Sequence, residues 1–94
     1  MALADVTSHK AVLQAVREFD HLGRDNFLAK YGFGRARRYF LEINGRLYDS
    51  KAIVGVAHGY QFPQQGPLTS KDFSGGEATV QQKLEELKFT VRVV

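Results

Sequence analysis

Apolar residues recur at every third or fourth position in the first part of the chain, the spacing of one buried helix face. From Ser8 to Leu22 this pattern predicts a first helix, with Thr7 as its N-cap and Gly23 as the left-handed residue that ends it. Asp25 is then expected to cap a short second helix, which stops at Gly32–Gly34. The second helix is too short to be stable alone, so we expect it to pack against the first.

The pattern changes to β-prone residues in the middle of the chain. Tyr39–Ile43 and Arg46–Asp49 flank the dipeptide Asn44-Gly45. Asn-Gly favours a two-residue type I′ turn, because both central residues of that turn need a positive φ. Closure at this turn predicts the cross-strand pairs Ile43–Arg46, Glu42–Leu47, Leu41–Tyr48 and Phe40–Asp49.

A third helix is expected from Lys51 to about Gly59, capped by Asp49 or Ser50. Its residues are apolar nearly all round, which is typical of a buried central helix. The segment Gln61–Phe73 holds both prolines and is expected to be a loop. A loop of that length in a small domain either packs against the core or has a role of its own.

The last part of the chain predicts a fourth helix and a strand. Ser74–Glu77 has the spacing of a capping box, and the buried stripe of the helix consists of Val80, Leu84 and Leu87. Phe89–Val93 alternates apolar and polar residues like a half-buried strand. The predicted fold class is α+β, with about four helices packed on one face of a small antiparallel sheet formed by the β-hairpin and the C-terminal strand.

Composition places the chain among ordinary globular proteins: 94 residues form one expected domain (1–94), with 44% hydrophobic and 24% charged residues. There is no apolar stretch of about 20 residues and no secretory h-region, so neither a membrane partner nor export is expected. The absence of cysteine excludes disulfides and thiolate ligands and fits a cytoplasmic location. The three histidines have no metal-ligand spacing and no triad or phosphate-loop motif is found, so we expect no catalysis, metal or cofactor in this domain.

Positive charge is concentrated in one stretch. The net charge is +3, but the stretch from Lys30 to Lys51 holds six cations against two acids, and the rest of the chain is slightly acidic. Within it lies the cluster Arg35, Arg37, Arg38 and Tyr39. Arginine binds phosphates in a bidentate manner, and a neighbouring aromatic ring can stack on a base or flank a sugar. An equally weighted alternative is that Arg37 and Arg38 pair with Glu42 and Asp49 inside the fold. From the side of the acids, Arg46 and Arg38 are the expected partners.

Two helix starts add candidate anion sites. Ser74-Gly75-Gly76 would present bare amides at a helix N-terminus, with Lys71 just upstream, although a tight turn explains the glycines as well. Tyr48-Asp49-Ser50-Lys51 places a lysine in a first helical turn, where the helix dipole disfavours a cation. The partner of Lys51 would then be either Asp49 or an incoming phosphate.

These residues carry a family resemblance. The matching segments are Phe27…Tyr31-Gly32-Phe33-Gly34…Arg38-Tyr39-Phe40, Asn44–Ile53, Ala57-His58-Gly59 and Phe73–Glu77…Leu84…Leu87-Lys88-Phe89. They resemble the N-terminal head domain that precedes HNH nucleases in McrA-like (type IV) restriction endonucleases, which cut modified DNA and whose other domains recognise phosphorothioate or methylated cytosine. Lys88 stands where that pattern has glycine, so the fourth helix is expected to exit by another turn.

The resemblance implies the head module of a larger nuclease whose catalytic HNH domain is not in this chain. The first hypothesis is an accessory DNA-binding module that contacts the phosphate backbone of double-stranded DNA through a single concave surface. The candidate contacts are Arg35, Arg37, Arg38, Tyr39, Tyr48, Ser50, Lys51, Lys71, Ser74, Gly75 and Gly76, and a pocket that reads a modification would use Tyr39, Tyr48 or Tyr60. The rival hypothesis is a scaffolding domain that docks on sister domains or forms a homodimer of the parent protein, with an exposed apolar patch and no affinity for DNA.

Overall fold

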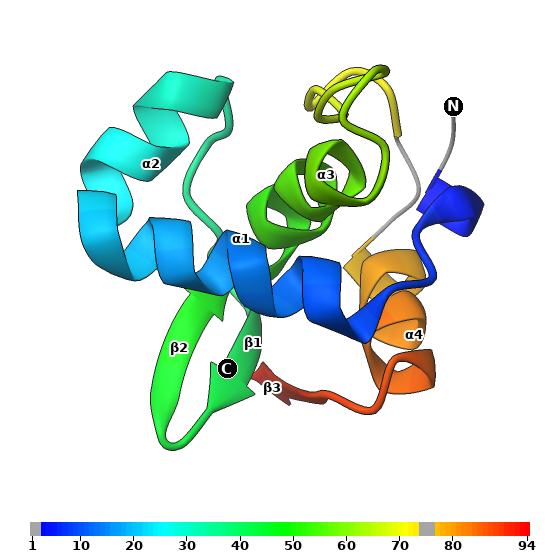
Figure 1. Cartoon of the computed structure of the whole chain (residues 1–94). Coiled ribbons are helices and arrows are strands. Elements are labelled where there is room, and N and C mark those ends of the chain that lie inside the picture. The colour runs from blue at the N-terminus through cyan, green and yellow to red at the C-terminus, as the bar shows by residue number, and fades with distance from the viewer. Residues whose placement is uncertain (1–2, 74–76) are drawn as a thin grey trace.

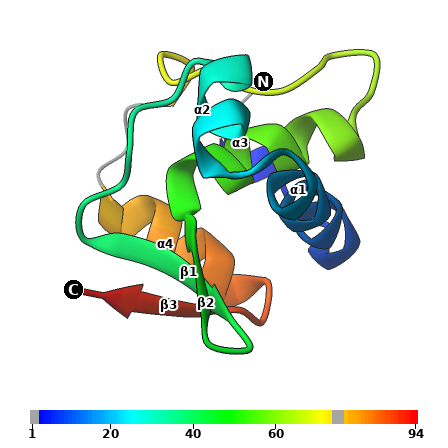
Figure 2. The same ribbon diagram turned by 90° about the vertical axis from the view of Figure 1, so that its left-hand side faces the viewer.

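The computed structural model describes residues 3–73 and 77–94, and it has the predicted α+β fold (Figure 1). In chain order the elements are the 3₁₀ helix η1 (Leu3–Asp5), α1 (His9–Leu22), α2 (Arg24–Tyr31), β1 (Tyr39–Ile43), β2 (Arg46–Asp49), α3 (Ser50–Gln61), α4 (Glu77–Glu86) and β3 (Thr90–Val93). The view in Figure 2 shows α1, α2 and α3 on one side of the sheet's hairpin and α4 beside β1 and β3. No helix within the described residues is long and apolar enough to cross a membrane.

The first two helices follow each other with one residue between them. The N-cap of α1 is Ser8, whose Oγ accepts the Ala11 N–H at 3.0 Å, so the prediction of Thr7 was wrong by one position. Gly23 ends α1 with a positive φ of 85°, and its N–H donates to the Phe19 carbonyl at 2.9 Å. Because α2 begins directly after Gly23, Asp25 lies in its first turn and does not cap it.

The sheet confirms the register predicted from Asn44-Gly45. Both turn residues have positive φ, 52° for Asn44 and 80° for Gly45, as a type I′ turn requires. The four predicted pairs between β1 and β2 all occur, and β3 pairs antiparallel with the other edge of β1, giving the strand order β2-β1-β3. The hairpin therefore fixes where Asp49 and the start of α3 lie.

The central helix α3 is buried as predicted, but it continues to Gln61. The following loop packs against it: the Leu68 N–H donates to the Gly55 carbonyl at 2.9 Å, and His58 Nδ1 donates to the Gly66 carbonyl at 2.9 Å. A Cβ on Gly55 would lie 2.7 Å from the Phe33 ring, so glycine permits this close approach. The loop is thus part of the core packing.

The end of α4 corrects the expectation about Lys88. Lys88 itself adopts the left-handed conformation (φ 74°), so the helix exits by the turn that glycine would make. The Phe89 N–H donates to the Leu84 carbonyl and the Lys88 N–H to the Glu85 carbonyl, both at 3.0 Å, which is the Schellman pattern. Val80 and Leu84 are buried and Leu87 is half-buried, whereas Phe89 precedes β3. The predicted capping box begins at Ser74, outside the described residues.

Candidate nucleic-acid interface

The segment between α2 and β1, residues 32–38, carries the arginine cluster and is held in place by Asp49. The Asp49 carboxylate is 3% exposed and accepts hydrogen bonds from Arg24 Nε at 2.9 Å, Arg24 Nη2 at 2.8 Å and the Ala36 N–H at 2.8 Å. Arg24 also donates to the Ala36 carbonyl at 3.3 Å. The hydrogen bond to Asp49 raises the pKa of Arg24 above its ordinary value. Both backbone groups of Ala36 are therefore fixed by an ion pair between β2 and α2.

The arginines on either side of Ala36 are exposed. Arg35 pairs with Asp25 at the surface, and its side chain is 63% exposed. The Arg38 guanidinium lies over the Tyr39 ring, 5.9 Å from its centroid. Arg37 and Arg38 make no ion pair with any residue that the structure describes. Two adjacent guanidinium groups on an anchored segment thus remain available to an anionic partner.

The expected internal partners of these arginines were wrong. Asp49 is used by Arg24, and the Glu42 carboxylate accepts from Arg92 Nε and Nη2, both at 3.1 Å. Arg46 lies 3.6 Å from Asp20. The acids that would have neutralised the cluster are engaged by cations that lie far away in sequence.

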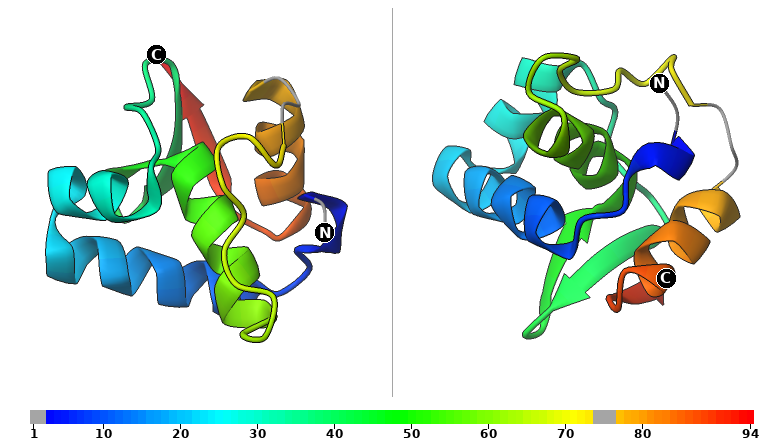
Figure 3. Two further views of the ribbon diagram at one scale, coloured as in Figure 1. Left: turned by 90° about the horizontal axis from the view of Figure 1, so that it is seen from above. Right: turned by 45° about the vertical axis from the view of Figure 1, so that its right-hand side comes forward.

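Segment 32–38 lies on the opposite side of the molecule from α1. In the left view of Figure 3 α1 runs along one side, whereas this segment and the end of the chain lie on the other. The Val94 N–H donates to the Arg38 carbonyl at 2.8 Å, which joins the end of the chain to the segment. An anionic surface that contacts the arginines therefore approaches from the side away from α1.

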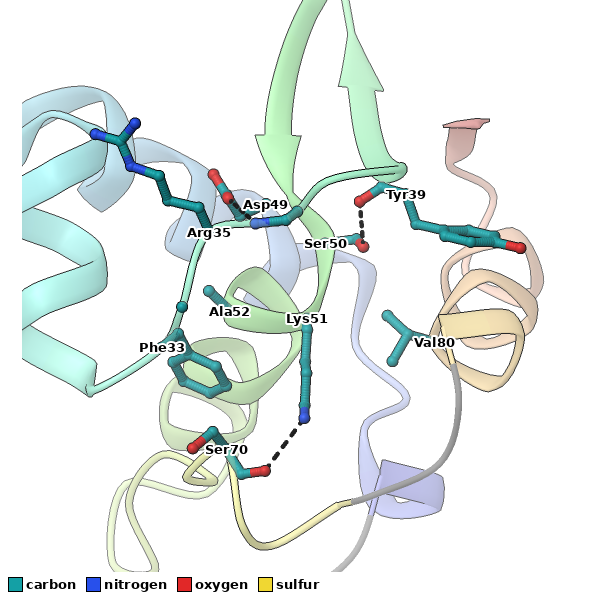
Figure 4. A pocket seen from close by; sticks show the side chains of 11 residues that line it. Phe33, Arg35, Tyr39, Asp49, Ser50, Lys51, Ala52, Ser70 and Val80 are labelled. Carbon is teal, nitrogen blue, oxygen red and sulfur yellow. Dashed lines mark hydrogen bonds between the residues drawn. The ribbon is translucent and has the colours of Figure 1, made fainter. Parts of the chain in front are cut away.

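A cavity of about 330 Å³ opens beside this segment (Figure 4). Four of the predicted site residues line it: Arg35, Tyr39, Ser50 and Lys51. In Figure 4 the Arg35 side chain extends away from Lys51 toward α2, whereas Tyr39 lies near Val80 of α4. Arg37 and Arg38 directly precede Tyr39 in the sequence but do not line the cavity. The structure thus brings four of the eleven predicted residues to one cavity, and Arg37 and Arg38 lie on the adjoining segment.

Lys51 is half-buried in this cavity. Its Nζ donates to the Ser70 carbonyl at 3.2 Å and lies 5.1 Å from the centroid of the Phe73 ring. It makes no ion pair with Asp49 or with another carboxylate among the described residues, so the structural alternative proposed for it was wrong. The ammonium group is held by a neutral carbonyl and an aromatic ring.

The neighbours of Lys51 have roles within the fold. Tyr48 is 3% exposed, and its hydroxyl donates to Asp20 Oδ1 at 2.9 Å. Burial, followed by this hydrogen bond, raises the pKa of Tyr48. The buried Ser50 hydroxyl donates to the Tyr39 carbonyl at 2.9 Å. The motif Tyr48–Lys51 therefore connects α1, segment 32–38, β1 and the loop after α3 through four successive side chains.

The remaining candidates lie elsewhere. Lys71 is exposed but does not line the cavity, and Ser74, Gly75 and Gly76 lie outside the described residues. Tyr60 lies apart from the cavity on α3, where its hydroxyl donates to Glu18 at 2.6 Å. Among the described residues no group of histidine and carboxylate side chains could hold a metal ion.

Glu18 is the acceptor of a second polar cluster. It also accepts hydrogen bonds from Lys30 at 2.7 Å and from the Tyr31 hydroxyl at 2.6 Å. Burial alone would raise the pKa of Glu18, but hydrogen bonds from Lys30, Tyr31 and Tyr60 outweigh it and bring the pKa below its ordinary value. The hydrogen bond to Glu18, with burial, raises the pKa of Tyr60 to about 12. This cluster fixes α2 and α3 to α1 and leaves little free charge.

Sequence reasoning missed Arg24 as the anchor of the arginine segment. Its position, one residue after a helix-ending glycine, gave no signal of a contact with Asp49, 25 residues later. The hairpin register predicted one part of this contact, because it placed Asp49 at the end of β2, opposite Phe40. In the structure the Arg24 guanidinium lies over the Phe40 ring, 5.9 Å from its centroid.

Comparison with known proteins places the chain in a family. The family described as "ScoMcrA-like, N-terminal head domain" matches residues 4–93. The chain belongs to this head-domain family. Among solved structures, the head domain is similar to part of one described as the "Type IV phosphorothioation-dependent restriction endonuclease ScoMcrA", with 34% identity and a TM-score of 0.70. The match covers 96% of the head domain but only 13% of the ScoMcrA chain. No curated protein matches the sequence.

The family assignment confirms the resemblance inferred from the motifs. The matched region contains both Tyr48–Lys51 and the arginine segment. In this head domain the side chains of Tyr48–Lys51 form hydrogen bonds with neighbouring elements of the fold, whereas Arg35, Arg37 and Arg38 are exposed.

Proposed function

We propose that this head domain is an accessory DNA-binding module of a modification-dependent HNH restriction endonuclease. It binds the phosphate backbone of double-stranded DNA through Arg35, Arg37 and Arg38, with Lys51 in the adjoining cavity. The nuclease chemistry belongs to another domain of the parent protein, and the head contributes affinity and orientation in the cytoplasm. Its similarity to part of a phosphorothioation-dependent enzyme supports modified DNA as the target of the whole protein.

The observation that carries this proposal is the exposed Arg37–Arg38 pair on an anchored segment. Both guanidinium groups lack an acidic partner among the described residues, while Asp49 and Arg24 hold Ala36 in place beside them. An anchored segment loses little conformational entropy on binding, and arginine forms bidentate hydrogen bonds with phosphate oxygens. The resulting affinity is expected to be weak, salt-dependent and largely independent of base sequence.

Fluorescence polarisation with a short labelled duplex tests this proposal at about 50 mM and about 200 mM salt. The variant Arg37→Ala/Arg38→Ala should weaken binding about tenfold at the lower salt concentration and reduce the slope of log K against log salt by about 2. The matched control is Lys10→Ala/Arg17→Ala, which removes the same charge from exposed positions of α1 on the opposite side. The control should bind as the parent does.

Equal losses in both variants would refute a specific arginine surface, because net charge alone would then explain the affinity. No salt-dependent binding by the parent domain would favour the rival scaffolding function. The exposed large apolar side chains in the described part of the chain lie on three different elements: Leu47 on β2, Tyr60 on α3, and Val93 with Val94 at the end of β3.

A further inference from the structure

We propose that the cavity beside Lys51 holds one unstacked nucleotide, with its phosphate on Lys51 Nζ and its base against the Tyr39 ring. This inference rests on the proposed function and adds a ligand to it. The duplex backbone would lie on Arg37 and Arg38, and a single nucleotide that has left the stack, at a strand end or from a distorted pair, would enter the cavity.

The charge balance of the cavity favours an anion. The only described acid in the lining, Asp49, already accepts two hydrogen bonds from Arg24 and one from Ala36. Among the residues that the structure describes, Lys51 has only the Ser70 carbonyl and the face of Phe73 as partners. A half-buried ammonium without a counter-charge is costly unless a ligand supplies one. A phosphate group would supply that charge and accept the hydrogen bonds that Lys51 does not use.

The rest of the lining is suited to a base. Tyr39 is half-buried at one side of the cavity near Val80, and Phe33 lies at the other side beside Ala52, with Lys51 between them (Figure 4). Stacking of a base on an aromatic ring is favourable and tolerates any base, because every base has a π-face. The volume of about 330 Å³ lies at the small end of ligand cavities, so it can take one small ligand but no longer segment.

Segment 32–38 borders the cavity and continues into Arg37 and Arg38, although the Arg35 side chain itself extends away from Lys51 toward α2 (Figure 4). Arg35 lines the cavity and also belongs to the arginine segment, two residues before Arg37. A strand whose phosphates lie on the segment would therefore lead into the cavity without crossing another element. This continuity favours a nucleotide of the bound DNA over a free metabolite.

Nuclear magnetic resonance titration of the ¹⁵N-labelled domain tests the cavity directly, with dTMP, thymidine and inorganic phosphate as separate probes. We expect dTMP to shift the amides of Lys51, Ala52 and Ser70 with a millimolar Kd, and phosphate to bind at least fivefold more weakly. Equal binding of dTMP and phosphate would refute the contact with a base, and equal binding of thymidine would refute the contact between Lys51 and phosphate. The absence of shifts at about 10 mM dTMP would overturn the whole inference.

Variants separate the two contacts. Lys51→Met should reduce the affinity for dTMP about tenfold. Tyr39→Leu should reduce it while Tyr39→Phe retains it, because only the ring matters. The spectra of each variant report whether it is folded, and a folded Lys51→Met domain that binds dTMP as the parent does would contradict the proposal.

The duplex assay distinguishes failure of this inference from failure of the proposed function. Arg37→Ala/Arg38→Ala should lose duplex affinity but keep its dTMP shifts. Duplex binding without dTMP binding would leave the backbone function intact and remove the cavity site. Binding of dTMP without duplex binding would retain the pocket as a nucleotide site and remove the proposed function, and with it the link to bound DNA.

Discussion

The anchor at Asp49 makes a quantitative prediction. Asp49→Asn keeps the size of the side chain but removes its charge and replaces one acceptor oxygen by a donor. That donor must face either Arg24 Nε, at the position of Oδ1, or both Arg24 Nη2 and the Ala36 N–H, at the position of Oδ2. The carboxylate now accepts three hydrogen bonds of 2.8–2.9 Å. Each bond to a charged group is worth about 1.5–3 kcal/mol when its partner stays buried. Because the Arg24 side chain is 37% exposed, water can replace part of what it loses.

We therefore expect Asp49→Asn to lower the free energy of unfolding by about 2 kcal/mol. For a domain of this size the corresponding fall in Tm is about 10 °C. Urea denaturation followed by circular dichroism measures the free energy, and hydrogen exchange of the Ala36 amide measures the local effect. Exchange at Ala36 should accelerate more than exchange at buried amides of α3, because its acceptor belongs to the side chain that the substitution alters and that then holds Arg24 less tightly.

The matched control is Asp25→Asn, which removes the same charge from a carboxylate that is 76% exposed and pairs with Arg35 at the surface. Such a pair contributes less than about 1 kcal/mol, so the control should remain close to the parent. If Asp49→Asn and Asp25→Asn unfold at the same urea concentration, or if Ala36 exchange is unchanged, the ion pair does not anchor segment 32–38 and the reasoning is wrong.

Two further predictions concern the ends of the fold and its second polar cluster. Lys88→Gly should stabilise the domain by about 1 kcal/mol in the same urea assay, because glycine adopts the observed φ of 74° without steric cost, whereas Lys88→Ala should not; equal stability of the two variants would contradict this. The lowered pKa of Glu18 means that the folded state holds its carboxylate charged, so this contribution to stability is present above the ordinary pKa of 4.5 and lost as pH falls through the lower folded value. Glu18→Gln should flatten that acid limb when unfolding is measured against pH, and an unchanged acid limb would show that the cluster contributes nothing there.

Local sequence patterns predicted the helices and strands well. Contacts between residues far apart in the sequence were not predicted. Asn44-Gly45 determined a turn, and through it every pair between β1 and β2, because the side-chain period of a strand leaves no freedom once the turn is set. The ion pairs were predicted from closeness in sequence. In the fold, however, Asp49 meets Arg24 and Glu42 meets Arg92, contacts that depend on helix packing and on β3.

The candidate site was predicted in part for the same reason. Lys51 and Tyr39 line one cavity because the hairpin brings the start of α3 next to the start of β1, which the register already implied. Tyr48 and Ser50 lie in the same motif, but neither side chain lies free in the cavity. The Tyr48 hydroxyl donates to Asp20 of α1, and the Ser50 hydroxyl donates to the Tyr39 carbonyl of β1. A motif read as a string of letters does not reveal which of its side chains the core uses.

Segment 32–38 is held through the main chain of Ala36, which has a consequence for the substitutions that the segment can accept. The framework is secured through the main chain of Ala36 and the carboxylate of Asp49, and neither depends on the side chains at positions 35, 37 and 38. Substitutions at those three positions therefore leave the hydrogen bonds of Ala36 with Arg24 and Asp49 in place. The surface charge of this segment can change by three units while its main chain stays anchored, which makes the segment a suitable starting point for redesign.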